Sequence, residues 1–279
     1  MKVSRRLVTY SVLLLIAIAA MVWLRSYMIR SGGQPLTERD LLEILASGEL
    51  NVVTDYNSIG YFVSGDTVRG FQLEMMQALE RDWGIRVNFF LENSLEDNVK
   101  GLHKQRYDLI ARSIPVNTEL REQVTFTIPI SLNKQVLVQR KAEFNDGVEP
   151  IRQHLELAKK VIHVPSNSPA ILRIDNLSYE IGDTIFIVED PTYEVEQLVM
   201  MVAAGDIDFT VCDEKIASRL IHILPEIDTE TDISFTQLES WAVRAGSPVL
   251  LDSLNSWLTR FKKTKAFQRL HEKYYGAVG

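Results

Sequence analysis

Hydrophobic and polar positions along the body of the chain alternate between strand-like runs and helical spacing. Strands are expected at residues 50–56, 86–92 and 107–111. Apolar residues at helical spacing lie between these strands, at 71–83, which stops before Gly84, and at 94–104, which opens with Ser94 and Asp97 in a capping-box pattern. The alternation of strand and helix predicts a parallel sheet covered by helices.

A second set of elements with the same alternation follows. It begins after residues 134–144, and its strands are expected at 160–165, 184–190 and 207–213. One helix is predicted at 168–177, because Ser168 and Pro169 form an N-cap and first-position pair, and another at 192–204, ending at Gly205. After residues 240–245, two amphipathic helices at roughly 248–261 and 264–275 close this set.

These two sets predict an α/β protein with two lobes, each a mostly parallel sheet flanked by helices. We expect lobe 1 to comprise residues 34–137 together with 240–279, and lobe 2 to comprise 138–239. The chain would then cross between the lobes twice, near 135–142 and near 238–245.

The first 33 residues differ from the body. Residues 7–24 carry no charge over eighteen positions, which is near the lower limit for a membrane-spanning helix. Trp23 and Tyr27 fit the interface of a bilayer, and three basic residues before the run and two after it favour a cytoplasmic N-terminus. We therefore expect a single-pass anchor in the cytoplasmic (inner) membrane, a linker, and a body in the periplasm. The small residues at 17–20 leave cleavage, and a secreted periplasmic body, as the alternative.

Charge and cysteine usage exclude several classes of function. The net charge is −7, and because residues 1–33 carry +5, the body carries −12, which argues against nucleic-acid binding. A single cysteine, Cys212, allows neither an internal disulfide nor a cysteine-based zinc site, and the five histidines show no metal-ligand spacing. We expect no metal and no cofactor.

Four segments in order resemble the family 3 solute-binding proteins, the amino-acid-binding periplasmic proteins. They are "VRGFQLEMMQALERDWGIRVNFF", "RYDLIARSIPVNTELREQVTFTIPI", "VAAGDIDFTVCDEKIA" and the tail from "WAVRAG" to "EKYYG". The resemblance covers about residues 40–276 and implies the type II two-lobed periplasmic-binding-protein fold. Within that family the chain looks nearest to the non-catalytic N-terminal domain of membrane-bound lytic transglycosylase F. Those proteins continue into a lysozyme-like catalytic domain, which we do not expect in a chain that stops at Gly279.

The resemblance implies charged ligand-binding residues at three positions. Arg121 would hold the ligand's α-carboxylate, since a guanidinium matches a carboxylate with two parallel N–H groups. Asp213 would accept from the α-ammonium, and Asp55, at the end of the first strand, would assist. The alternatives are a solvated surface role for Arg121 and a helix N-cap role for Asp213.

Three further residues complete the expected site. Tyr61 and Phe71 are candidates for an aromatic pocket wall, and Ser168 lies at a helix start that favours an anion. The alternatives are a core position for Phe71 and simple capping for Ser168. Asp108 and Asp208 also match family positions, and we interpret both as structural.

One departure from the family's pattern bears on the ligand. Where many members carry a serine or threonine five residues before the arginine, this chain has Val116. Losing a hydrogen bond to a charged ligand group weakens binding by roughly 1.5–3 kcal/mol unless another donor replaces it. A short peptide or a muropeptide therefore stays open as a ligand beside a free amino acid.

The leading hypothesis is a membrane-anchored binding protein whose lobes close on an amino acid, small peptide or muropeptide, for transport or sensing. Its expected partners are the membrane subunits of an ABC importer or another envelope protein. One alternative is a non-catalytic interaction module related to lytic transglycosylase F. The other is a dehydratase of small acids on the same fold, for which no glutamate in the sequence has an evident reason for a raised pKa.

Overall fold

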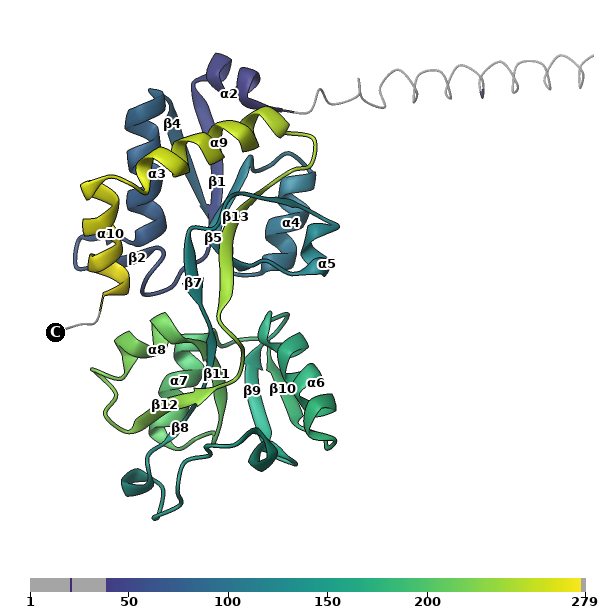
Figure 1. Cartoon of the computed structure of the whole chain (residues 1–279), viewed down its shortest axis with the longest axis vertical. Coiled ribbons are helices and arrows are strands. Elements are labelled where there is room, and N and C mark those ends of the chain that lie inside the picture. The colour runs from purple at the N-terminus through teal and green to yellow at the C-terminus, as the bar shows by residue number, and fades with distance from the viewer. Residues whose placement is uncertain (1–20, 22–38, 277–279) are drawn as a thin grey trace, which may run out of the picture. The chain divides into compact units, whose positions relative to one another are not determined.

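Two β-sheets flanked by helices organise the chain from Asp40 onward in this computed structural model, which describes Met21 and residues 39–276 (Figure 1). The strands of lobe 1 are β1 (Glu49–Thr54), β4 (Arg86–Leu91), β5 (Leu109–Pro115), β6 (Thr125–Phe126), β7 (Ser131–Asn133) and β13 (Gln237–Val243). Its helices are α2 (Leu41–Ser47), α3 (Phe71–Trp83), α4 (Leu95–His103), α5 (Thr118–Arg121), α9 (Pro248–Phe261) and α10 (Lys265–Tyr275).

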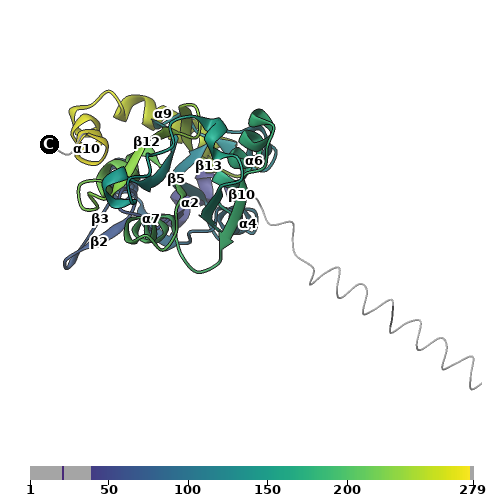
Figure 2. The ribbon, with the colours of Figure 1, turned by 90° about the horizontal axis from the view of Figure 1, so that it is seen from below.

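Lobe 2 repeats this architecture. Its strands are β8 (Gln135–Arg140), β9 (Val161–Pro165), β10 (Phe186–Asp190), β11 (Thr210–Asp213) and β12 (Ile227–Asp232). Its helices are α6 (Ala170–Ile181), α7 (Val195–Ala204) and α8 (Glu214–Leu220), with short 3₁₀ turns η1 (Ala142–Phe144) and η2 (His154–Leu157). A small exposed hairpin, β2 (Phe62–Ser64) with β3 (Thr67–Arg69), projects from lobe 1 (Figure 2).

Each sheet is mixed rather than mostly parallel. In lobe 1 the strands run in the order β4-β1-β5-β13-β6, and β1 is parallel to β4 and β5 while β13 is antiparallel to β5. In lobe 2 the order is β10-β9-β11-β8-β12, and β8 is antiparallel to both neighbours. The antiparallel strands β8 and β13 are those that follow the two crossings between lobes. They do not arrive through a right-handed βαβ connection, so the rule that makes such strands parallel does not apply to them.

The structure confirms several helices that local patterning predicted. The helix predicted at 71–83 is α3, and it ends before Gly84, whose left-handed φ of 65° is typical of a C-terminal glycine. The helix predicted at 248–261 is α9. Ser94 caps α4 by accepting from the N–H of Asp97. The start of α6 was misplaced: the helix begins at Ala170, because the N–H of Ser168 closes a turn onto the carbonyl of Pro165.

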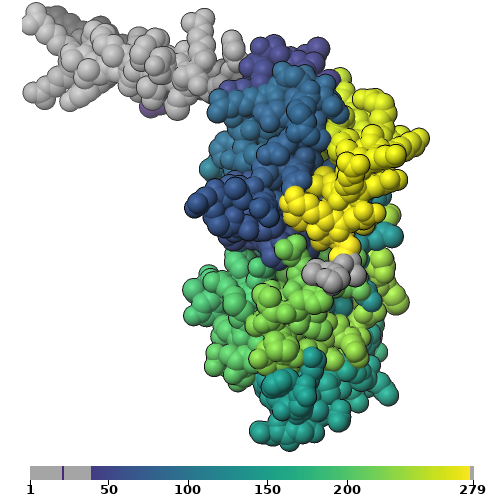
Figure 3. Space-filling view, turned by 90° about the vertical axis from the view of Figure 1, so that its left-hand side faces the viewer, coloured from purple at the N-terminus to yellow at the C-terminus, as the bar shows by residue number. Residues whose placement is uncertain are grey.

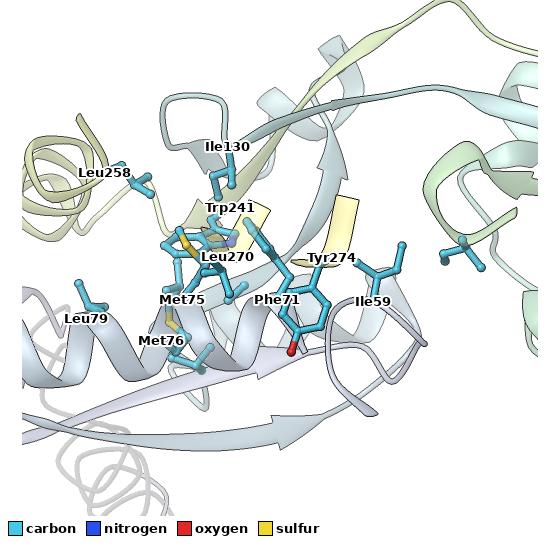
Figure 4. Close-up of a cluster of buried hydrophobic side chains, with 14 of the residues drawn as sticks. Ile59, Phe71, Met75, Met76, Leu79, Ile130, Trp241, Leu258, Leu270 and Tyr274 are labelled. Carbon is cyan, nitrogen blue, oxygen red and sulfur yellow. The ribbon is translucent and has the colours of Figure 1, made fainter. Parts of the chain in front are cut away.

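The core of lobe 1 forms where α3, α9 and α10 pack on the sheet. Phe71, Met75 and Leu79 lie one turn apart on α3 and are fully buried, together with Trp241 of β13 (Figure 4). The indole N–H of Trp241 donates to Oε1 of Gln72 at 2.8 Å, so the largest core side chain is also satisfied in its hydrogen bonding.

Gly70 fixes the loop at residues 55–60 against the start of α3. Its φ is 147°, and a Cβ there would lie 2.1 Å from the carbonyl oxygen of Gly60. The N–H of Phe71 donates to Ile59 at 2.7 Å, and the N–H of Gln72 donates to Gly60 at 3.0 Å. Only glycine permits this close approach, which holds the loop after β1 at the edge of lobe 1.

The hinge is a short antiparallel ribbon of β7 and β13. Glu239 is opposite Ser131, and Leu238 is opposite Leu132. Because side chains alternate along a strand, the two leucines share one face and are about half exposed (51% and 57%), whereas Glu239 is 3% and Asn133 6% exposed on the other face. The hinge thus directs a glutamate and an asparagine to the interior.

Within the described part of the chain, no helix is long and apolar enough to cross a membrane. The anchor predicted at residues 7–24 lies, apart from Met21, outside that part.

Candidate functional site

A cavity of about 20 Å³ lies where lobe 1, lobe 2 and the hinge meet. It is lined by Asp55, Asn57, Ile59, Gly60, Gln72, Ser113, Asn133, Asp213, Lys215, Ile216 and Tyr275. That volume holds about one water molecule. A larger ligand therefore enters only if the lobes part or side chains rearrange.

The two lobes touch directly beside this cavity. The backbone N–H of Ser58 in lobe 1 donates to Oε1 of Glu196 on α7 at 2.7 Å. The guanidinium of Arg219 on α8 lies 5.5 Å from the ring centroid of Phe62. In the space-filling view the blue atoms of lobe 1 and the green atoms of lobe 2 meet without a gap (Figure 3). The described arrangement is a closed one.

Asp55 presents one carboxylate oxygen to the cavity. Its Oδ2 accepts from Arg112 at 3.1 Å and from Asn57 Nδ2 at 2.8 Å, and the same arginine donates to the carbonyl of Asn93 at 2.7 Å. Oδ1 of Asp55 is buried and has no hydrogen-bond donor among residues 39–276. The ion pair thus orients the carboxylate and leaves one oxygen available as an acceptor.

Asp213 lies across the cavity on lobe 2, at the end of β11. It occupies the N-cap position of α8, but its side chain makes no capping hydrogen bond. Burial, together with the negative charges of Glu239 and Asp55, raises the pKa of Asp213 to about 8, against the opposing effect of Arg112. The carboxyl group therefore keeps its proton at neutral pH in this closed arrangement.

Glu239 and Asn133 form the hinge side of the site. Ser131 Oγ donates to Glu239 at 2.8 Å, and Asn133 Nδ2 donates to Glu239 at 3.1 Å. Burial raises the pKa of Glu239, while the hydrogen bonds from Asn133 and Ser131 oppose the rise. Because the amide nitrogen of Asn133 is used on Glu239, its Oδ1 remains as an acceptor, with no donor in the described part of the chain.

Tyr275 of α10 closes the cavity from lobe 1. Burial raises the pKa of its hydroxyl group, and the nearby side chains of Ser113 and Ser131 oppose the rise. Its ring centroid lies 4.6 Å from that of Phe71, so the C-terminal helix is packed into the core and lines the cavity at once.

The six residues predicted for the site separate into two groups. Asp55 and Asp213 line the cavity together, whereas Arg121, Tyr61, Phe71 and Ser168 do not. Arg121 is exposed on α5, and Ser168 Oγ accepts from the N–H of Ala170 at the start of α6.

The two aromatic candidates pack against other rings. Tyr61 lies with its centroid 5.6 Å from that of Phe89. Phe71 is fully buried among the rings of α10 (Figure 4). It therefore occupies a core position, which was the alternative to a pocket-wall role.

Sequence reasoning missed Lys215, Tyr275, Asn133 and Glu239. Lys215 lies two residues after Asp213, within the segment "VAAGDIDFTVCDEKIA" that carries the family resemblance, so the sequence did contain a signal for it. Asn133 and Glu239 are 106 residues apart, and no local pattern joins them. Among residues 39–276 no group of three or more His, Cys, Asp or Glu side chains is arranged to hold a metal ion.

Comparison with known proteins identifies the family to which this sequence belongs. Residues 50–277 match the bacterial extracellular solute-binding proteins, family 3. The chain belongs to this family. The family predicted from the sequence is thereby confirmed.

Relatives share half of their length with this chain. The membrane-bound lytic murein transglycosylase F of Pseudomonas fluorescens is 26% identical over 242 residues, which is 85% of this chain and 48% of the relative. The chain thus spans about half the length of the curated relatives it matches.

Solved structures establish the two-lobed fold. A mutant of ArgBP from T. maritima has a TM-score of 0.71 at 21% identity, covering 84% of this chain and 97% of that one. An ancestral arginine-binding protein bound to arginine also has a TM-score of 0.71, at 20% identity, covering 82% and 99%. The predicted two-lobed, periplasmic-binding-protein-like α/β fold is confirmed.

Proposed function

We propose that this chain is a membrane-anchored extracytoplasmic solute-binding protein that closes its lobes on an amino acid, a small peptide or a muropeptide, for transport or sensing. The observation that carries the proposal is the cavity to which lobe 1, lobe 2 and the hinge each contribute polar side chains. A ligand that contacts Asp55 and Asp213 at once stabilises the closed arrangement, since it binds the open one with only half of these contacts.

Each end of such a ligand has a chemical partner in the cavity. The carboxyl groups of Asp55 and Asp213 suit an ammonium group. Lys215 is the cationic residue of the lining, and it forms no ion pair with a residue in 39–276, so we assign it to the ligand's carboxylate. Arg121, which the family resemblance implied for that role, lies on exposed α5.

The anchor and the partners belong to the same proposal. Residues 7–24 would hold the protein in the cytoplasmic membrane with its body in the periplasm. The relative from Pseudomonas fluorescens is named as a membrane-bound protein, and this name is consistent with the proposed location. The closed body would then present its ligand to the membrane subunits of an ABC importer or to another envelope protein.

A thermal-shift screen of the full chain in mild detergent tests the proposal. The panel contains the common amino acids, short peptides and muropeptides. A ligand at about 100 times its Kd adds roughly 2.7 kcal/mol to the free energy of unfolding. A shift with one compound class, lost in Lys215→Met, supports the proposal; no shift with any compound favours an interaction module whose partner is a protein.

A small-acid dehydratase is a second candidate because the structure supplies the group that the sequence did not reveal. Asp213, with a pKa raised to about 8 by burial, carries a proton at neutral pH in a closed cavity, as a general acid requires. An ancestral amino-acid-binding protein described as a precursor of cyclohexadienyl dehydratase shares the fold with a TM-score of 0.69. Turnover of a cyclohexadienyl acid that is abolished in Asp213→Asn would establish this activity.

A further inference from the structure

The hinge side of the cavity offers hydrogen-bond acceptors without matching donors. Oδ1 of Asn133 and Oδ1 of Asp55 are both buried, and neither accepts a hydrogen bond from a residue in 39–276. Asn133 is 6% exposed and lines the cavity, so its Oδ1 is shielded from bulk solvent. Buried acceptors left in this way are costly unless something supplies N–H or O–H groups.

Glu239 decides which atom of Asn133 is available. A carboxylate only accepts hydrogen bonds, so the Asn133 amide must turn its nitrogen toward Glu239, as the 3.1 Å contact shows. Ser131 holds the other oxygen of Glu239 at 2.8 Å and fixes the carboxylate in place. Glu239 therefore acts through Asn133 as a positioning residue, although it does not line the cavity itself.

We propose that the hinge pair Asn133–Glu239 selects ligands by their charge, so that the group placed against the hinge is a cation with several N–H donors, an ammonium or a guanidinium. The inference rests on the proposed function, and it narrows the ligand class to amino acids or peptides with a basic end besides their α-amino group. An ammonium offers three donors and a guanidinium five, and neither has an acceptor that would oppose Asn133 Oδ1.

Charge supports a cation over a neutral amide of the same size. Asp55 and Asp213 line the cavity, Glu239 lies behind Asn133, and Arg112 is already paired with Asp55. Neither Asp213 nor Glu239 forms an ion pair with a residue in the described part of the chain. A neutral carboxamide or ureido group would bring a carbonyl oxygen to this acceptor-rich wall, whereas a cation brings only donors and the opposite charge.

Proton release gives the proposal a second signature. Burial keeps a proton on Asp213 near neutral pH, and a cation beside it would favour the ionised form. The titratable and charged groups around it come from five elements and one loop: Asp55, Arg112, Glu196, Lys215, Glu239 and Tyr275. Asp213, with a pKa of about 8, is the carboxyl group that carries a proton at neutral pH, so binding of a cation beside it should release that proton.

Isothermal titration calorimetry of the full chain in detergent tests the inference with matched probes. L-arginine is compared with L-citrulline, which has nearly the same shape and no side-chain charge, and L-lysine with L-norleucine. We expect the basic member of a pair to bind at least tenfold more tightly. Titration at pH 7 in phosphate and in Tris, whose ionisation enthalpies differ, should show a proton released with the basic member and none with the neutral one.

Glu239→Gln is the decisive variant, with exposed Glu143→Gln as its control. A glutamine can donate as well as accept, so Asn133 is free to present either end of its amide, and the basic-to-neutral affinity ratio should fall toward one. A role confined to stability would weaken both probes equally and leave the ratio unchanged. If Glu239→Gln does not fold, Asn133→Ala, which removes the acceptor itself, should reduce the same ratio.

The outcomes separate this inference from the proposed function. Tighter binding of the neutral member of each pair, or an unchanged ratio in the folded variants, overturns the charge selection and leaves a solute-binding protein. If no amino acid or peptide binds, the proposed function fails and the inference fails with it.

Discussion

The backbone N–H of Ser58 donates a 2.7 Å hydrogen bond to the carboxylate of Glu196, and this contact joins two lobes at residues 138 positions apart. Ser58 lies in the loop that Gly70 holds against α3, and Glu196 lies in the first turn of α7. Asn57, Ile59 and Gly60 of the same loop line the cavity, so the contact acts as a latch beside the candidate site.

Removing the latch should open the lobes. A hydrogen bond to a charged group contributes about 1.5–3 kcal/mol, so Glu196→Ala should shift the closed-to-open ratio by roughly tenfold or more. Nitroxide labels at exposed Leu45 and Phe144 report the distance between lobes by pulsed EPR, and buried Cys212 should not take up label. Glu230→Ala, on the exposed edge of lobe 2, is the control. An unchanged distance distribution in Glu196→Ala would show that other contacts hold the closed state.

The stability of the protein should fall as the pH rises from about 4 to about 8. The pKa of Asp213 is raised from 3.8 to about 8 in the folded state, mainly by burial, so the unfolded chain loses this proton first. One such group changes the free energy of unfolding by at most about 1.4 kcal/mol per pH unit in that window. Urea unfolding at pH 5, 6, 7 and 8 measures the slope.

The same measurement on Asp213→Asn tests the assignment. An asparagine cannot ionise, so the slope should decrease and the variant should be more stable than the wild type at pH 8. Asp206→Asn, at an exposed position, should keep the wild-type slope. A slope that persists in Asp213→Asn would assign the effect to Glu239, whose pKa is also raised by burial.

Lys215 and Arg121 should differ in their effect on ligand binding. Lys215 lines the cavity, whereas Arg121 is exposed on α5. Lys215→Met should weaken binding of the ligand found in the screen by roughly 10- to 150-fold, the equivalent of about 1.5–3 kcal/mol, and Arg121→Met should leave the Kd within about twofold. Calorimetric titration of both variants measures this. The reverse result would mean that the ligand-bound arrangement brings α5 to the cleft.

Two aspartates interpreted as structural should differ in their contribution to stability. Asp108 is fully buried and accepts from Arg244 at 3.3 Å and from the N–H of Asn51 at 3.0 Å. Asp108→Ala should cost about 3–5 kcal/mol, because it leaves a buried arginine without its carboxylate.

The second aspartate provides the matched control. Asp208 pairs with Arg140 at 3.0 Å, but its side chain is 73% exposed. Exposed pairs contribute about 0.2–1 kcal/mol, so Asp208→Ala should be close to the wild type in urea unfolding. Equal losses in the two variants would contradict the assignment of the buried pair.

Local patterning was sufficient for the boundaries of α3 and α9, and the family resemblance for two charged residues of the cavity. The boundaries of α3 and α9 follow from apolar residues at helical spacing and from Gly84, because these signals act within one or two turns. Asp55 and Asp213 were assigned from the family resemblance, and their places in the chain agree with it. Asp55 follows β1 and Asp213 ends β11, and the carboxyl ends of strands in such sheets border the ligand cleft.

The tertiary structure alone decided which side chains meet Asp55 and Asp213. Glu239 contacts Ser131 and Asn133 because β13 returns from lobe 2 and pairs antiparallel with β7, in a register that a shift of one residue would reverse. Strand pairing over about a hundred residues depends on where the chain crosses between lobes, and hydrophobic periodicity carries no information about that partner. The same limit applies to Arg121. The sequence shows that its guanidinium could bind a carboxylate, but whether it reaches the cavity depends on how α5 packs.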